Sequence, residues 1–337
     1  MLRQIPGFFC VLWSVLPAIL LNGAVLAQTG AGPIATSGQS ADQSSYVPHR
    51  VYDSRQKRFS DLEMMLLDLA RQDVVFVGEQ HDDPATHRLE RAILEGLARR
   101  RSNILVSLEM FERDSQSLLD NYLANRISEQ EFLKASRPWP RYQTDYRPLV
   151  EFAKSRQWSV LAANIPRKYA ARISREGLAT IDQLPPGERQ LVAQALHCPF
   201  DGYYDRFAEV MNSHPVATPG RESGEAKSAE AKKEIDARRR EMTERFYFAQ
   251  CAKDETMAES IVRRFDPPAL RPGPLVVHFN GAFHSDYGLG TAERVKRRLR
   301  GSGTKVVSII PLESLDQVDH DKYRKRGDYI LFTLVSK

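Results

Sequence analysis

One segment of this chain reads Val74-Val75-Phe76-Val77-Gly78-Glu79-Gln80-His81-Asp82-Asp83, and a later one reads Val276-Val277-His278-Phe279-Asn280-Gly281-Ala282-Phe283-His284-Ser285-Asp286. Each is a run of mostly apolar, β-favouring residues that stops at Gly-x-x-His and then turns polar. A buried strand that ends in this way places polar side chains at the carboxyl edge of a sheet, where open parallel sheets bind ligands. We therefore expect the two segments to face one crevice.

Strand-like and helix-like segments alternate along the chain and predict an α/β fold with a mainly parallel sheet flanked by helices. A helical region from about Pro186 through Met211 and a polar insertion at about 214–240 precede the last strands. The strands are expected at Val74–Val77, Ile104–Leu108, Val160–Ala163, Leu275–Phe279, Val306–Ile310 and Ile330–Val335. The expected helix caps are Asp83, Asp114 and the Ser128/Glu131 capping box.

The first 27 residues have the layout of a secretory signal peptide, with Arg3 ahead of an apolar run and small residues before Gln28. Residues 28–50 read as a flexible leader, and 51–337 as one α/β domain. We therefore expect an exported chain, periplasmic or envelope-associated, without a transmembrane segment after cleavage. Its net charge of +5 would fall to +4, because the signal peptide holds one arginine and no acid. The basic clusters fit no nucleic-acid motif.

Cysteine usage leaves two interpretations open. Cys198 and Cys251 remain after Cys10 is removed with the signal peptide, and no CxxC or CxxCH motif occurs. A zinc ribbon and covalent c-type haem attachment are therefore unsupported. In an oxidising compartment the two cysteines can pair, but their spacing equally allows two buried thiols.

Four residues at the predicted sheet edge carry the first candidate chemistry: Glu79, His81, Glu109 and His284. A carboxylate beside neutral imidazoles suits a divalent metal, or a general base with an orienting partner. The spacing matches no strict metal signature. The alternative is structural, in which these groups bond to backbone at strand and helix ends. For His278, inside an apolar strand, the structural interpretation is favoured.

Tyrosines with nearby arginines form a second constellation. A phenolate can ligate ferric haem, and guanidinium groups can pair with its propionates. The alternative is that such aromatic residues simply cover apolar surface with their polar ends in water. The tyrosine candidates are Tyr142, Tyr146 and Tyr203, and the cofactor-binding set also includes Arg147, Arg167, His81 and His284.

Several ordered segments between about Val51 and Leu312 resemble the ChaN-like haem-binding lipoprotein family, which is similar in turn to the wider Tiki and erythromycin-esterase group. The segments that carry the resemblance are Val77–His81, Leu108–Arg113, Trp139-Pro140, Tyr146–Leu149, Ala163–Arg167, Ala249–Cys251, Asp254–Ala258 and Gly281–His284. The resemblance implies an α/β fold, haem bound through a tyrosine, and a role in iron acquisition at the cell envelope. In the wider group, Gly-x-x-His and glutamate motifs serve hydrolysis, and Gly78–His81 and Glu109 match them.

The leading functional hypothesis is a periplasmic or envelope protein that binds haem non-covalently for haem or iron acquisition. Its candidate partners are haem, a second copy of the chain and envelope iron-uptake components. The alternative is a metal-dependent hydrolase of the Tiki and erythromycin-esterase type, with Glu79 as base or ligand and His81, Glu109 and His284 around it. A third possibility is a scaffold whose polar insertion contacts another protein.

Overall fold

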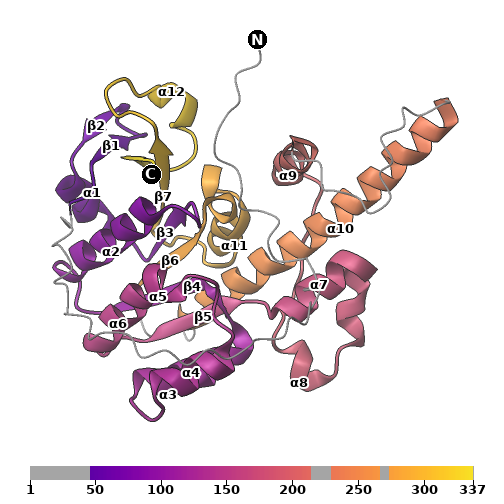
Figure 1. Ribbon diagram of the computed structural model, residues 1–337, viewed down its shortest axis with the longest axis horizontal. Helices are drawn as coiled ribbons and strands as arrows, with labels where there is room; N and C mark the ends of the chain where they lie inside the picture. Colours follow the sequence, from indigo (N-terminus) through magenta and orange to yellow (C-terminus); the bar gives the residue numbers. More distant parts are fainter. Residues whose placement is uncertain (1–45, 214–228, 266–272, 337) are drawn as a thin grey trace, which may run out of the picture.

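Eight strands form one sheet in the order β2-β1-β8-β7-β3-β6-β4-β5, with helices on both of its faces (Figure 1). They belong to a computed structural model that describes residues 46–213, 229–265 and 273–336. The six strands from β8 to β5 are parallel, and β1 and β2 extend the sheet as an antiparallel pair at one edge. The α/β fold with a mainly parallel sheet is thus confirmed. The strands are β1 His49–Asp53, β2 Arg58–Ser60, β3 Val74–Glu79, β4 Ile104–Glu112, β5 Val160–Asn164, β6 Leu275–Gly281, β7 Thr304–Leu312 and β8 Tyr329–Leu334.

Helices fill the connections between the strands. Those before the insertion are α1 Leu62–Leu69, α2 Pro84–Ala98, α3 Gln116–Leu123, α4 Glu129–Ser136, α5 Tyr142–Asp145, α6 Arg147–Ser155, α7 Arg167–Glu176, α8 Pro186–Arg189 and α9 Gly202–Ser213. Those after it are α10 Ala229–Val262, α11 Gly290–Arg298 and α12 His320–Tyr323. Short 3-10 turns lie at Arg113–Ser115, Leu178–Gln183, Arg263–Phe265, Ala282–His284 and Asp286–Gly288.

Alternate residues of each buried strand belong to two different cores. In β3, Val75 and Val77 pack into the cluster that includes α1, α2 and α6, whereas Val74 and Phe76 pack against α10 and α11. This follows from the two-residue period of a strand whose two faces are both covered. Glu79 continues the parity of Val75 and Val77, so it leaves the sheet on the α2 side.

The expected strands are all present, but the first hairpin was missed. His49–Asp53 contains three charged or histidine side chains in five residues, so its apolar signal is weak. Asp83 caps α2 by accepting from the Thr86 N–H, and Ser128 and Glu131 form a capping box, as predicted. The Asp114 cap was wrong, because a 3-10 turn at Arg113–Ser115 comes first and α3 begins after Ser115 without a side-chain cap.

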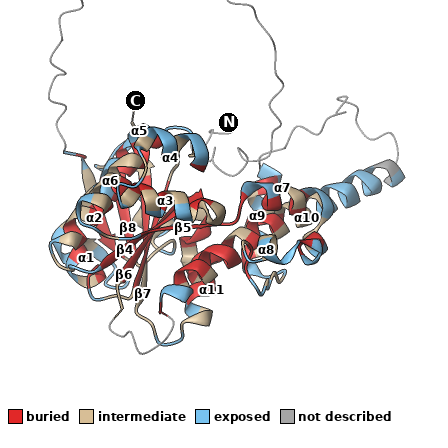
Figure 2. Cartoon of the chain, turned by 90° about the horizontal axis from the view of Figure 1, so that it is seen from below, coloured by how far each residue is buried: buried red, intermediate tan, exposed pale blue. Residues whose placement is uncertain are grey.

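The signal peptide and most of the flexible leader lie outside the described residues. Part of the polar insertion does so too. Residues 1–45 and 214–228 are not described. The second half of the insertion is the start of α10, whose first turns are exposed (Figure 2). The later turns of α10 are buried and include Tyr247, Cys251 and Asp254.

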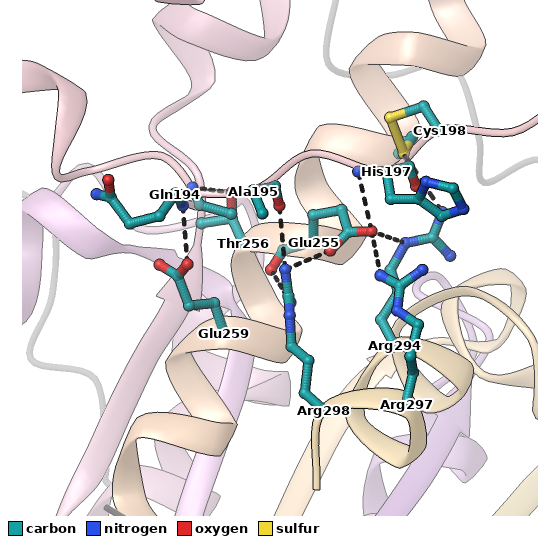
Figure 3. Close-up of polar contacts among 12 residues, drawn as sticks. Gln194, Ala195, His197, Cys198, Glu255, Thr256, Glu259, Arg294, Arg297 and Arg298 are labelled. Atoms are coloured by element: carbon teal, nitrogen blue, oxygen red, sulfur yellow. Dashed lines mark hydrogen bonds and ion pairs between the residues drawn. A yellow bond between two sulfur atoms is a disulfide. The ribbon is translucent and has the colours of Figure 1, made fainter.

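A disulfide between Cys198 and Cys251 ties the segment ahead of α9 to α10 and resolves the cysteine question in favour of pairing. Next to it, the buried Glu255 pairs with three arginines of α11 and accepts from the His197 N–H (Figure 3). The distances from Glu255 are 3.2 Å to Arg294, 2.6 Å to Arg297 and 2.5 Å to Arg298. Together these contacts join α11 to α10 on one face of the sheet.

Removing the disulfide should lower the free energy of unfolding. The bridge closes a loop between positions 53 apart, and loops of this size contribute roughly 2–4 kcal/mol, largely through the unfolded chain. Cys251→Ala should show this loss of free energy in urea denaturation. The parent protein in reductant, which lacks the same disulfide, is the matched control and should show a similar loss. Two free thiols in the denatured, unreduced parent would contradict the pairing.

Candidate functional site

The two Gly-x-x-His segments meet at one edge of the sheet. β3 and β6 are parallel neighbours in which Gly78 lies opposite Asn280 and Glu79 opposite Gly281. Their exits therefore point the same way, and the predicted shared crevice is confirmed: both His81 and His284 line one cavity of about 700 Å³. That volume is within the range of small-molecule and cofactor sites.

The cavity lining combines three kinds of side chain: an acidic and imidazole group, called the floor here, aromatic walls, and a cationic group, called the rim here. The floor contains Glu79, Glu109, His81, His284 and Asp286. The aromatic and apolar wall is formed by Trp139, Pro140, Tyr146, Tyr203, Val210 and Phe283. Five cationic side chains also line it: Arg141, Arg167, Arg206, Lys253 and Arg326. Such a lining suits a ligand that has an apolar body and carries anionic groups.

Glu79, His81 and Tyr146 form the first cluster of polar groups. His81 Nδ1 contacts Glu79 Oε1, and the Tyr146 hydroxyl donates to the same oxygen over 2.9 Å. Burial alone would raise the pKa of Glu79, but the neighbouring His81 and His87 outweigh it and hold that pKa well below its ordinary value. Burial opposes the charge on His81, yet Glu79 raises the pKa of its imidazole. This cluster is thus a carboxylate beside imidazolium groups.

Gly281 makes room for His81. A methyl group at position 281 would lie 2.5 Å from His81 Nε2, so only glycine lets this ring lie against the end of β6. The His81 ring also meets the edge of Trp139 at 5.0 Å between centroids. The glycine of the second segment therefore positions the histidine of the first.

Glu109, His284 and Asp254 form the second cluster. His284 Nε2 lies 3.1 Å from Glu109 Oε1, and Nδ1 lies 2.7 Å from Asp254 Oδ1. Burial would lower the pKa of His284, but the two carboxylates raise it to about 9. Burial conversely opposes ionisation of Glu109, and His284 nevertheless holds the pKa of Glu109 at about 2. His284 is therefore an imidazolium at neutral pH.

The other predicted residues divide into those on the cavity and those away from it. Tyr146, Tyr203 and Arg167 line it. Tyr142 does not: its ring packs against Phe111 and Phe132 in the core on the α2 side. Arg147 is also absent from the lining, because its guanidinium pairs with Glu129 at 2.5 Å. His278 donates to or accepts from Ser107 over 2.8 Å inside the sheet, in keeping with a structural role.

Sequence reasoning missed Asp254 and Gln250 and, of the cationic rim, Arg206, Lys253 and Arg326. Gln250 contacts His284 at 3.2 Å, and the Tyr203 hydroxyl donates to Asp254 over 2.7 Å. Both Asp254 and Gln250 lie in segments that carried the family resemblance, which was the available signal. Arg206 and Arg326 lie far apart in sequence, and no pattern linked either of them to the predicted sheet edge.

Comparisons with known proteins agree with this architecture. Residues 65–295 match a family described as "Haem-binding uptake, Tiki superfamily, ChaN". A solved structure of haem-bound ChaN from Campylobacter jejuni, described as cofacial haem binding, has a TM-score of 0.58 and 18% identity; the match covers 86% of this chain and 97% of that chain. An erythromycin esterase mutant, EreC, in its open conformation has a TM-score of 0.42 and 10% identity over 86% of this chain and 83% of that chain. No functionally curated protein matches the sequence.

The paired state of His284 predicts a loss of stability at alkaline pH. Its pKa rises from 6.5 in an unstructured chain to about 9 in the fold, so its stabilisation is complete below pH 6.5 and disappears as pH rises through about 9. The loss is on the order of 3 kcal/mol, because one pKa unit corresponds to about 1.4 kcal/mol.

Urea denaturation of the parent between pH 6 and 10 measures this dependence. His284→Gln, as the comparison variant, should be less stable at pH 6 and should lack most of the alkaline slope. Equal slopes in both proteins would contradict the assignment.

Proposed function

This chain belongs to the ChaN family of haem-binding uptake proteins in the Tiki superfamily, and on that basis we propose that it binds haem in the cavity at the carboxyl edge of the sheet. The observation that carries the proposal is the combination in one cavity of about 700 Å³ of tyrosine and histidine side chains, aromatic walls and five cationic groups. Phenolate and imidazole are haem-iron ligands. The residues present therefore fit the group that the family implies.

Tyr146 is the side chain that we propose as the axial ligand. Its hydroxyl donates to Glu79 Oε1 over 2.9 Å, so a proton acceptor is already in place. His81 Nδ1 lies 3.5 Å from the same hydroxyl and can donate to a phenolate oxygen. Burial and the nearby carboxylates raise the pKa of Tyr146 far above its ordinary value, so the phenol stays protonated until a cation replaces the proton.

The cationic rim supplies the second part of haem recognition. Arg141, Arg206 and Arg326 line the cavity together with Arg167 and Lys253. Arginine pairs with carboxylates through two parallel hydrogen bonds, which orients a planar ligand as well as binding it. We propose that these groups bind the haem propionates while Trp139 and Phe283 cover the macrocycle.

Tyrosine-to-phenylalanine variants test the haem site. Ferric haem added to the mature parent should give a saturable absorption change with a tyrosinate-to-iron charge-transfer band. Tyr146→Phe should lose that band, because the oxygen ligand is removed. Tyr142→Phe is the matched control: the same substitution at a buried tyrosine away from the cavity should leave the band intact.

The outcomes separate the candidate functions. No saturable change in the parent would reject haem binding, and loss of the band in Tyr203→Phe alone would move the ligand to Tyr203. The hydrolase alternative would require ester or peptide hydrolysis that Glu79→Gln abolishes. We place binding ahead of hydrolysis because the family that the chain matches over residues 65–295 is described by haem-binding uptake.

We also propose that the chain is exported and serves haem or iron acquisition at the cell envelope. The Cys198–Cys251 disulfide supports an oxidising compartment. Among the described residues, no helix is long and apolar enough to cross a membrane. The candidate partners remain envelope iron-uptake components and a second copy of the chain.

Processing of the amino terminus tests export. When the whole chain is expressed in a bacterium with two membranes, the periplasmic or envelope fraction should contain a protein that begins at Gln28. Intact mass should match loss of residues 1–27 and of the two hydrogens removed by one disulfide. An unprocessed chain confined to the cytosol would contradict export without affecting the haem proposal.

A further inference from the structure

We propose that Glu79, His87 and Glu90 form a buried site for one divalent first-row transition-metal ion, directly behind the floor of the cavity. Glu79 comes from the end of β3, and His87 and Glu90 are three apart on α2, so they lie on the same face of that helix. The proposal does not depend on haem binding, because neither His87 nor Glu90 lines the cavity.

The distances between the three side chains suit a shared ion. His87 Nδ1 lies 3.3 Å from Glu79 Oε2 and 3.0 Å from Glu90 Oε2. All three ligand atoms lie within 4.8 Å of one another. Metal–ligand bonds of about 2.0–2.2 Å place two ligand atoms of one tetrahedral ion roughly 3.3–3.6 Å apart. Small side-chain movements would therefore bring these three atoms onto one ion.

Two carboxylate oxygens of the cluster have no hydrogen-bond partner. Glu90 Oε1 has no partner, Glu79 Oε2 has only the 3.3 Å ion pair with His87, and neither glutamate side chain is exposed to solvent. Buried carboxylate oxygens are otherwise almost always satisfied, since leaving them without a donor is costly. A cation between them satisfies both carboxylates at once.

The remaining polar atoms are held by partners that orient metal ligands in known sites. His87 Nε2 lies 3.0 Å from the His81 carbonyl oxygen and 3.3 Å from Asp145 Oδ2, which leaves Nδ1 to face the carboxylates. Glu79 Oε1 is engaged by Tyr146 and His81, which leaves Oε2 for the ion. Metal-bound histidines typically donate their second N–H to a carbonyl or carboxylate in this way.

The ligand set selects the class of ion. One imidazole nitrogen and two carboxylates suit Zn²⁺, Mn²⁺ or Fe²⁺, whereas Mg²⁺ and Ca²⁺ prefer oxygen ligands alone. Glu79 belongs both to this cluster and to the cavity wall. The cluster therefore borders the cavity through Glu79.

Zinc titration of the chelator-treated, haem-free mature chain tests the site. Competition with a chromophoric chelator should show one equivalent of Zn²⁺ bound, with Mg²⁺ a poor competitor. Glu90→Gln keeps the shape of the side chain and replaces a carboxylate oxygen with an amide nitrogen that does not bind metal, so it should weaken Zn²⁺ binding by at least ~10-fold. Glu95→Gln, the same substitution at an exposed position of α2, is the matched control and should leave the affinity unchanged.

Two further measurements test whether the zinc ion lies at this cluster. X-ray absorption of the zinc-loaded chain should show one imidazole among nitrogen and oxygen ligands and no sulfur. The proposal is overturned if the parent binds no stoichiometric zinc, if Glu90→Gln binds as tightly as the parent, or if His284→Ala abolishes binding while Glu90→Gln retains it. Haem titration of metal-free Glu90→Gln should match that of the metal-free parent, which separates this proposal from the haem site.

Discussion

The parallel pairing of β3 with β6 is the constraint on which the site depends. It sets Glu79 opposite Gly281, so two segments about two hundred residues apart end side by side at one sheet edge. The absence of a side chain at Gly281 then admits the His81 ring. A register slip of one residue would turn Glu79 toward the α10 side and separate it from His87 and Tyr146. The position of the cavity is thus determined mainly by the register of β3 and β6 rather than by the loops.

Strand alternation divides the polar groups between the two faces of the sheet. Glu79 leaves β3 on the side of α2, while Glu109, which follows Leu108 by one residue in β4, lies on the side of α10 near Asp254 and His284. Each carboxylate meets a histidine there. Two separate imidazole–carboxylate clusters therefore border one cavity. His87 of α2 lies beside Glu79, and Asp254 of α10 lies beside His284.

The sequence was sufficient to predict what depends on local pattern. Apolar runs ending at Gly78 and Gly281 located the strands, and Asp83 and Ser128 located helix starts, because a strand period or a cap involves only a few neighbouring residues. It could not predict that Tyr142 would face the core while Tyr146, one helical turn later, faces the cavity. It also missed Asp254, since the partners of His284 come from α10, beyond the polar insertion. Those relations arise only when distant elements pack.

Glu79 links the cavity to the interior because its two oxygens have different neighbours. Oε1 is shared by Tyr146 and His81 on the cavity side, and Oε2 faces His87 behind them. A positive charge placed near Oε2 would draw electron density away from Oε1 and weaken its hold on the Tyr146 proton. The same charge would make a phenolate at Tyr146 easier to form. If both proposals hold, an ion in the buried cluster and ligation at Tyr146 would be coupled through this one carboxylate, without any movement of the sheet.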